Sequence, residues 1–263
     1  MPGSPQIRQS KHWDFNNEVN MKVVIYGSNG QLGPHVVKAL EGHVDLRLTD
    51  LEPFDTPHDM MIVDVSDPDA VTRAAEGMDA IINLSVLRPH RQIAFDVNTL
   101  GCYNIMRAAV AHGIPRVINT GPHFTVQGAP YEALDYNIGP DVPPKPSTNL
   151  YALSKGLGQE ICRIFAEQSD VYVLCYLFYI FCYHDDLSRP GLNRPFLVTW
   201  RDASAAFLPG LTIDLQTLPS QCEVFNIFAN RPHQKFSNEK AKRILGWQPK
   251  DDLAHTYTKE NRK

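Results

Sequence analysis

A tyrosine and a lysine stand four positions apart in the stretch NLYALSKGLGQE, at Tyr151 and Lys155. Residues at this spacing lie one above the other on a helix, so both side chains can face the same cleft. A free phenol has a pKa of about 10 and is a poor base at neutral pH, but a nearby ammonium favours its ionised form. The pair can therefore take a proton from a hydroxyl group. The alternative is a solvated helix face that carries both residues.

A glycine-rich turn, YGSNGQLG, places Gly27, Gly30 and Gly33 directly after an apolar run and before a helix-like segment. Glycines let the backbone approach a pyrophosphate closely, and the N-terminus of the next helix offers free N–H groups. Asp50 ends the second apolar run, where its carboxylate can accept ribose hydroxyls of NAD and repel the 2′-phosphate of NADP. The pattern predicts NAD. Its alternative is a tight turn with a capping acid.

Short apolar runs alternate with helix-like segments between residues 22 and 180. Strands are expected over 22–26, 44–49, 61–63, 80–84, 116–120 and 171–180, and helices over 31–40, 68–76 and 93–111 and around Tyr151. This alternation predicts an α/β fold, a Rossmann-type doubly wound parallel sheet. Asp64, expected at the end of the third strand, can bind the adenine amino group or cap the helix that begins at Pro68.

The same pattern divides the chain into three parts. Residues 1–20 are polar and contain no apolar segment, so we expect a flexible leader and no signal peptide. Residues 21–180 form the expected NAD-binding domain. Residues 181–263, where the periodicity weakens, are expected to form a small substrate-binding portion. A stretch rich in Pro and Gly over 121–148 precedes the Tyr151 helix, and a loop of that length is usually functional.

Composition restricts the classes of partner. The net charge of −4 and the pI of about 6.2 provide no positive field for nucleic acid or for an anionic membrane. The longest apolar run, 171–183, is shorter than the roughly 20 residues that a membrane helix needs. Five cysteines without CxxC spacing predict buried free thiols in a reducing cytoplasm. The histidines show no HxxxH or HExxH spacing, so no metal site is expected.

Together, GSNGQLG, Asp50, VNTLGCYN with Asn98, and the Tyr151–Lys155 pair resemble the extended short-chain dehydrogenase/reductase family of NAD-dependent epimerases, dehydratases and dehydrogenases. The resemblance covers about residues 21 to 255. Local strings such as LRLTDLEPFD, AHGIPRV and LGWQPKDD look more like uronate dehydrogenases than like nucleotide-sugar enzymes.

The resemblance implies that Tyr151 is the general base and that Lys155 binds the nicotinamide ribose. It implies that Asn98 steadies the catalytic helix or a water relay, although Asn98 can equally be a satisfied helix-interior residue. Members of the family commonly form dimers through the helix after Asn98 and the helix with Tyr151, so a homodimer is possible. The residues expected to contact NAD are Gly27, Ser28, Asn29, Gly30, Gln31, Leu32, Gly33, Asp50, Asp64, Val65, Leu84, Ser85, Asn98, Tyr151 and Lys155.

The chain departs from the family just after the fifth strand, where a serine or threonine hydroxyl normally binds the reacting oxygen. The string INTGPHFTVQG offers Gly121, Pro122 or His123 at this position. A compensating Thr120, Thr125 or His123, a changed reaction, and lost catalysis are the three explanations, and we favour the first. Loss of one positioned donor without compensation lowers the rate by about 100- to 1000-fold.

An acidic substrate requires a cation. Arg189 and Arg194, in SRPGLNRPF, and Arg88, after the fourth strand, can grip a carboxylate, although they can also be solvated loop arginines. With His123 and Thr125, they form the expected substrate set. The sequence predicts NAD-dependent oxidation of a sugar or sugar acid, with Tyr151, Lys155, Thr120, His123 and Asn98 as the catalytic set. The alternatives are a nucleotide-sugar epimerase or dehydratase, and an NAD-binding sensor or scaffold with weakened catalysis.

Overall fold

A computed structural model of the chain describes residues 21–88, 90–123, 136–187, 192 and 194–257. The expected leader, Thr125 and Arg189 lie outside these residues. Within the described ranges, no helix combines the length and the apolar character needed to cross a membrane.

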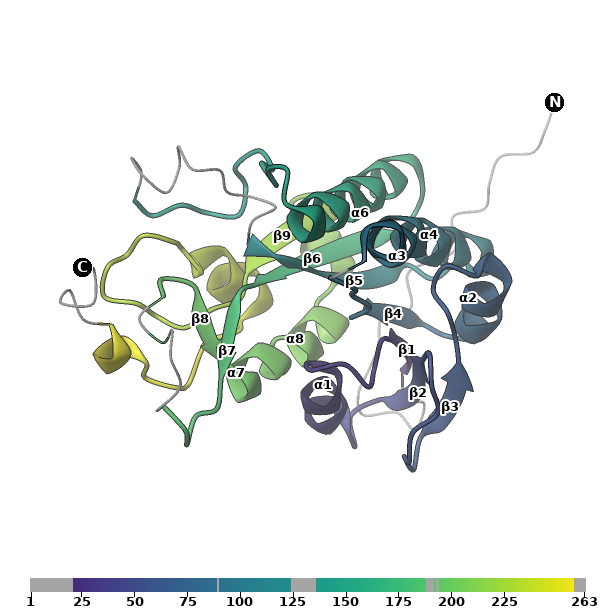
Figure 1. The fold of residues 1–263 in the computed structure, drawn as a ribbon, viewed down its shortest axis with the longest axis horizontal. Helices are drawn as coiled ribbons and strands as arrows, with labels where there is room; N and C mark the ends of the chain where they lie inside the picture. Colours follow the sequence, from purple (N-terminus) through teal and green to yellow (C-terminus); the bar gives the residue numbers. More distant parts are fainter. Residues whose placement is uncertain (1–20, 89, 124–135, 188–191, 193, 258–263) are drawn as a thin grey trace.

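A seven-stranded sheet with the order β3-β2-β1-β4-β5-β6-β9 forms the centre of the structure (Figure 1), and all of its pairings are parallel. The order reverses between β1 and β4, which in such sheets opens a crevice at the carboxyl ends of the strands. This confirms the predicted Rossmann-type fold. The strands are β1 (Lys22–Tyr26), β2 (Asp45–Asp50), β3 (Asp59–Ile62), β4 (Ala80–Asn83), β5 (Arg116–Pro122), β6 (Tyr172–Phe178) and β9 (Cys222–Asn226).

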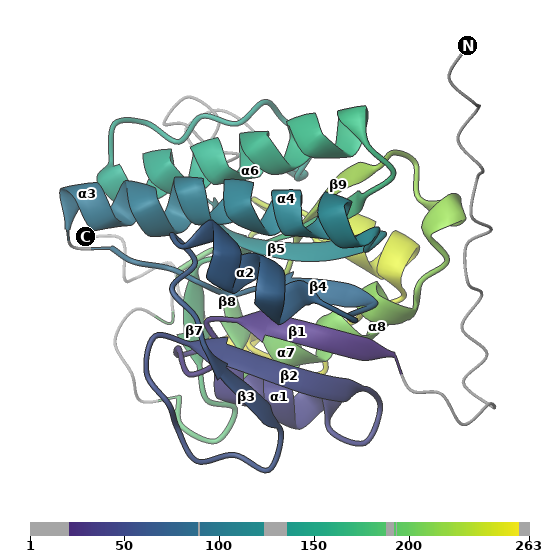
Figure 2. The same ribbon diagram turned by 90° about the vertical axis from the view of Figure 1, so that its right-hand side faces the viewer.

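Helices cover both faces of the sheet (Figure 2). One face carries α2 (Pro68–Ala75), α4 (Gly101–His112) and α6 (Leu150–Gln168), and the other carries α1 (Gly33–Leu40), α7 (Trp200–Ala205) and α8 (Phe207–Thr212). Side chains of β1 alternate between the two cores, with Val23 and Ile25 in one and Val24 and Tyr26 in the other. Strands buried on both faces read as continuous apolar runs, which is why these strands could be predicted.

The helix expected over 93–111 is divided into three segments. These are α3 (Arg91–Phe95), a π-helical turn η1 (Asp96–Leu100) and α4, whose C-cap is Gly113 with a φ of 63°. Single π-helical turns are frequent at functional sites, and η1 contains Asn98.

Residues after 180 contribute to the main sheet as well as to smaller elements. The last strand of the sheet, β9, comes from the segment expected to form the substrate-binding portion. The strands β7 (Ile180–Cys182) and β8 (Leu197–Thr199) form a separate pair. The remaining short elements are η3 (Leu215–Thr217), the π-helical η4 (Ala241–Leu245) and η5 (Ala254–Thr256).

The helix-capping interpretation of Asp64 is wrong. The strand β3 ends at Ile62, and the Asp64 carboxylate accepts hydrogen bonds from the main-chain N–H and the hydroxyl of Ser66, both at 2.8 Å. The N-cap of α2 is Asp67, whose carboxylate accepts the N–H groups of Asp69 and Ala70. Asp67 directly precedes the first helical residue, the position at which a side chain can reach these donors.

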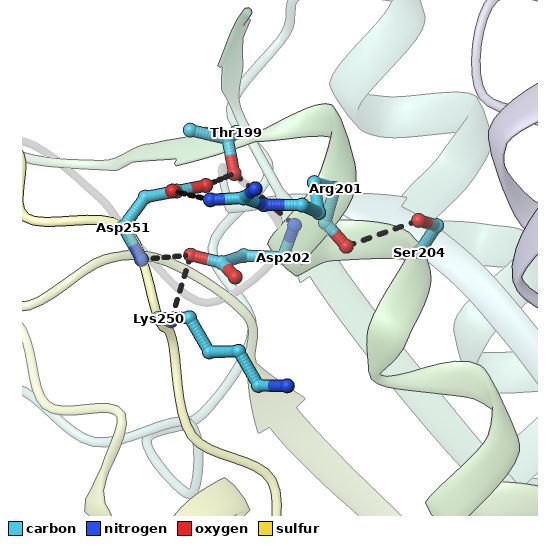
Figure 3. Close-up of polar contacts among 6 residues, drawn as sticks. All are labelled: Thr199, Arg201, Asp202, Ser204, Lys250 and Asp251. Atoms are coloured by element: carbon cyan, nitrogen blue, oxygen red, sulfur yellow. Dashed lines mark hydrogen bonds and ion pairs between the residues drawn. The ribbon is translucent and has the colours of Figure 1, made fainter. Parts of the chain in front are cut away.

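A buried carboxylate holds the C-terminal string LGWQPKDD against α7 (Figure 3). Asp202 accepts the main-chain N–H groups of Lys250 at 3.0 Å and Asp251 at 2.9 Å. The indole N–H of Trp247 donates to the Asp202 carbonyl at 2.9 Å, and the Thr199 hydroxyl donates to the Asp251 carboxylate at 2.6 Å. Because α7 packs against α1, the helix that follows the glycine turn, the string LGWQPKDD stabilises the helix layer on this face of the sheet.

Replacing Asp202 by alanine should lower the free energy of unfolding by about 1–3 kcal/mol, because two N–H groups lose their acceptor. Asp202→Asn is the matched control, since its amide oxygen can still accept both. Burial raises the pKa of Asp202, so its ionisation weakens the folded state. The asparagine variant should therefore gain stability relative to the wild type as the pH rises above about 4. Urea denaturation at acidic and neutral pH measures both effects. An alanine variant as stable as the wild type would contradict this anchor.

Candidate functional site

The glycine turn is shaped by close main-chain contacts. Gly27 has a φ of 76°, and a Cβ atom there would lie 2.8 Å from the main chain of Ser85. A Cβ atom on Gly33 would lie 1.9 Å from the carbonyl oxygen of Ser28. The N–H groups of Gly27 and Ser28 both donate to the Thr49 carbonyl at 3.0 Å, which fixes the turn to β2. Only glycine fits at Gly27 and Gly33.

Asp50 lies beside this turn. Its Oδ2 accepts the N–H of Asn29 at 2.9 Å and its Oδ1 accepts the N–H of Leu51 at 2.8 Å, which leaves further lone pairs for ribose hydroxyls. The helix α1 begins at Gly33 without a side-chain cap, so its first N–H groups are available to an anion. The turn, the uncapped helix and the acid therefore fit a dinucleotide such as NAD.

The other expected cofactor residues lie around the same turn and the neighbouring strand ends. Asn29, Gly30 and Gln31 are exposed and Leu32 is partly buried, whereas Ser28, Val65, Leu84 and Ser85 are buried. Asp64 is exposed. Contact of these residues with NAD remains a prediction.

Lys155 is buried at the carboxyl ends of β4 and β5. Its ammonium donates to the carbonyl oxygens of Ser85 at 2.8 Å and Thr120 at 3.0 Å. An ammonium has three donors, so one remains for a ribose hydroxyl. Burial lowers the pKa of Lys155.

Tyr151 lies partly buried in the first turn of α6, where Asn149 caps the helix by accepting the N–H of Ala152 at 3.1 Å. Burial raises the pKa of Tyr151, and the charge and a hydrogen bond of Arg88 oppose this rise. The guanidinium carbon of Arg88 lies 4.8 Å from the centre of the Tyr151 ring. Arg88 is therefore a cation beside the phenol that sequence reasoning did not predict. The acidifying role expected for Lys155 remains a prediction.

Asn98 is fully buried and joins three segments. Its amide donates to the Leu87 carbonyl at 2.9 Å and to the Ser154 hydroxyl at 3.0 Å, and its oxygen accepts the Leu87 N–H at 3.2 Å. A Cβ atom on Gly158 would lie 2.2 Å from the Asn98 carbonyl oxygen, so α6 packs directly on η1. Asn98 thus connects the loop after β4 to the helix that bears Tyr151.

The residues at the position of the missing hydroxyl, and the expected substitutes Thr120 and His123, have contacts of their own. Gly121 and Pro122 pair with β6 at the end of β5. The Thr120 hydroxyl donates to the Asn83 carbonyl at 2.9 Å. His123 is buried among aromatic rings, with its ring centre 4.1 Å from that of Tyr179 and 5.0 Å from that of Phe196.

Arg194, expected to bind a substrate carboxylate, is exposed between β7 and β8. Across the described ranges, no group of three or more His, Cys, Asp or Glu side chains is arranged to hold a metal ion.

The structure brings Tyr151, Lys155, Asn98, Ser85 and Thr120 together near the carboxyl ends of β4 and β5. Sequence reasoning missed the contact between Arg88 and Tyr151, the link through Ser154, and the close packing at Gly158. A glycine in the interior of a predicted helix was the available signal for Gly158. No sequence signal pointed to the Arg88 contact.

Comparison with known proteins gives consistent matches. The curated uronate dehydrogenase of Agrobacterium fabrum is 35% identical over 108 residues, which cover 40% of this chain and 39% of that protein. The uronate dehydrogenase of Pseudomonas putida is 28% identical over 156 residues, covering 56% of each chain. The chain thus spans about half the length, or less, of these relatives.

Among solved structures, uronate dehydrogenase from Agrobacterium tumefaciens has a TM-score of 0.70 and 25% identity, with 89% of this chain and 85% of that chain covered. The model of the NAD dependent epimerase/dehydratase family matches residues 23–188, more than half of the chain. NAD is the cofactor of that family, and the turn and Asp50 fit it. The chain is a member of the NAD dependent epimerase/dehydratase family.

Proposed function

We propose that the chain is an NAD-dependent oxidoreductase that oxidises a hydroxyl group of a sugar or sugar acid, in the manner of a uronate dehydrogenase. The observation that supports the proposal is the position of the Lys155 ammonium, which binds the Ser85 and Thr120 carbonyl groups at the ends of β4 and β5. Lys155 lies one helical turn from Tyr151, and the main chain of Ser85 contacts the glycine turn at Gly27. The similarity to uronate dehydrogenases supports a sugar-acid substrate.

In this proposal, the glycine turn, Asp50 and Lys155 would hold NAD, which would supply the acceptor for a hydride from the carbon that bears the hydroxyl group. Tyr151 takes the hydroxyl proton on its phenol oxygen. Lys155 uses its remaining N–H to orient the nicotinamide ribose, and Asp50 holds the adenosine ribose. Asn98 keeps the loop after β4 against α6, so that the base and the lysine hold their relative position. Arg88 and Arg194 are the described cations that can bind a substrate carboxylate.

An NAD reduction screen tests this function. The purified chain is incubated with NAD and either free sugar acids, such as galacturonate and glucuronate, or nucleotide sugars, and NADH absorbance is followed. NADH formed with a free sugar acid would support the proposal. Turnover of a nucleotide sugar without net NADH would favour the epimerase or dehydratase. The missing hydroxyl at Gly121–Pro122 is the observation that favours a sensor or scaffold, and tight NAD binding without turnover of any sugar would support that alternative.

Replacing Asp50 by serine should weaken NAD binding about tenfold and reduce the preference for NAD over NADP, because the ribose loses a carboxylate acceptor and a 2′-phosphate is no longer repelled. Fluorescence titration with both dinucleotides measures these affinities. Asp170→Ser is a suitable comparison, since Asp170 is exposed just before β6, at the end of the sheet opposite the glycine turn. A serine variant at position 50 with the wild-type preference would refute the assignment.

We propose a homodimer as the assembly. The outward side of α4 and α6 carries exposed apolar residues, namely Tyr103 and Val110 on α4 and Leu157 and Ile164 on α6. The two helices lie side by side (Figure 2), so these residues form one face that a second copy can cover. Light scattering of the purified chain gives the mass, and a monomer at micromolar concentration would contradict the assembly.

We also propose a reducing, cytoplasmic location, which the five free cysteines support.

A further inference from the structure

The loop after β4 places Arg88 beside Tyr151, the proposed general base. The Asn98 side-chain amide accepts the main-chain N–H of Leu87 and donates to the Leu87 carbonyl group. The same amide nitrogen also donates to the Ser154 hydroxyl on α6. The Ser154 hydroxyl donates in turn to the carbonyl groups of Leu150 at 2.8 Å and Tyr151 at 3.2 Å. The residue after Leu87, Arg88, is thereby fixed next to the first turn of α6.

The contact that results joins a cation to a phenol. The Arg88 guanidinium lies over the Tyr151 ring, with its carbon 4.8 Å from the ring centre, and its positive charge lowers the pKa of the phenol. A guanidinium over an aromatic face is attracted by the ring and remains protonated at every pH that the protein meets. Arg88 is exposed, so its charge is partly screened by water.

Lys155 is the next cation along the helix that bears Tyr151. Lys155, on the same helix, directs its ammonium to the carbonyl groups of Ser85 and Thr120. Within the described part of the chain, Arg88 is the charged group that lowers the pKa of Tyr151, and burial is the opposing influence. The Thr120 hydroxyl donates to the Asn83 carbonyl at 2.9 Å.

We infer that Arg88 sets the ionisation of Tyr151, because it places a positive charge from the loop after β4 over the phenol ring. The inference deepens the proposed function and rests on Tyr151 being its base. As the substrate C–H and O–H bonds break and the C=O bond forms, the hydride goes to NAD and the proton to the Tyr151 oxygen. Arg88 keeps its own proton throughout and stabilises the phenolate that exists before the transfer.

The test measures the ionisation of this one phenol without any substrate. A fluorinated tyrosine, which is more acidic than tyrosine, is incorporated at position 151, and fluorine NMR follows its titration with and without NAD. Arg88→Gln should move the midpoint upward by about one pH unit, a tenfold loss of phenolate at a given pH. Arg88→Lys, which keeps the charge, should restore most of the shift. Arg91→Gln removes an exposed charge three positions away and should leave the midpoint unchanged.

The same variants are then assayed for NAD reduction across pH. The alkaline displacement of the Arg88→Gln profile should match the NMR shift. A midpoint within about 0.3 units of the wild type in Arg88→Gln would overturn the inference. An arginine that only grips a substrate carboxylate would give that result, together with a higher KM for acids alone. If the midpoint shifts but no sugar is oxidised, the role of Arg88 stands and the proposed function fails. Circular dichroism checks that each variant is folded.

Discussion

Tyr151→Phe is expected to lower kcat/KM for NAD-dependent sugar oxidation by about 100- to 10,000-fold, the usual contribution of a positioned general base. The substitution removes only the phenol oxygen. The ring remains in the first turn of α6, where Arg88 can still lie over it, and neither the glycine turn nor Asp50 is touched. The affinity for NAD should therefore stay within a few-fold of the wild-type value.

Initial rates of NADH formation and a separate NAD titration distinguish these effects. Tyr103→Phe is the matched control, because Tyr103 lies exposed on α4 and packs against Phe165 outside the site. That variant should retain wild-type rates. If Tyr151→Phe kept more than about a tenth of the activity, another group would have to be the base.

Gly158→Ala should displace α6 from η1 and so misplace Tyr151 and Lys155. The added methyl group would lie 2.2 Å from the Asn98 carbonyl oxygen and 2.8 Å from the Cys102 sulfur, so α6 must move away from η1. Alanine is better than glycine in a helix by about 1 kcal/mol, but overpacking against main chain outweighs this gain. We expect the free energy of unfolding to fall by about 3 kcal/mol. Activity should fall by at least about 100-fold, because Tyr151 and Lys155 lie on the displaced helix.

Gly156→Ala provides the comparison on the same helix. Its methyl group would meet only side-chain atoms of Pro146, at 3.1 Å, which can shift slightly. That variant should match or exceed the wild-type stability. Thermal denaturation and NADH formation, measured well below the melting temperature of both variants, separate unfolding from misplacement. Equal behaviour of the two alanine variants would refute the close packing of α6 on η1.

The layers of the fold could be predicted because local patterns determine them. Parallel strands buried on both faces appear as apolar runs, and the predicted 116–120 differs from β5 by two residues at one end. The π-helical turn at Asn98 could not be predicted, since the apolar pattern of 93–111 also suits one continuous helix. The place of β9 in the sheet depends on pairing with β6, which strand patterns do not encode.

In the site too, local motifs could be predicted from the sequence, whereas contacts between distant segments could not. The glycine turn, Asp50 and the Tyr151–Lys155 spacing are local motifs, and sequence reasoning found them. It also found the missing hydroxyl after the fifth strand. The contact between Arg88 and Tyr151 depends on the Asn98 bridge between η1, the loop after β4, and α6, so it required the three-dimensional arrangement.

The two carbonyl acceptors of Lys155 have an evolutionary consequence. Without the ammonium, the carbonyl oxygens of Ser85 and Thr120 would lose a partner at the junction of two central strands, at a cost of about 1–3 kcal/mol each. A homologue without catalytic activity would therefore still need Lys155 for the stability of its fold. Substitution of Tyr151, rather than of Lys155, would identify homologues that have lost catalytic activity.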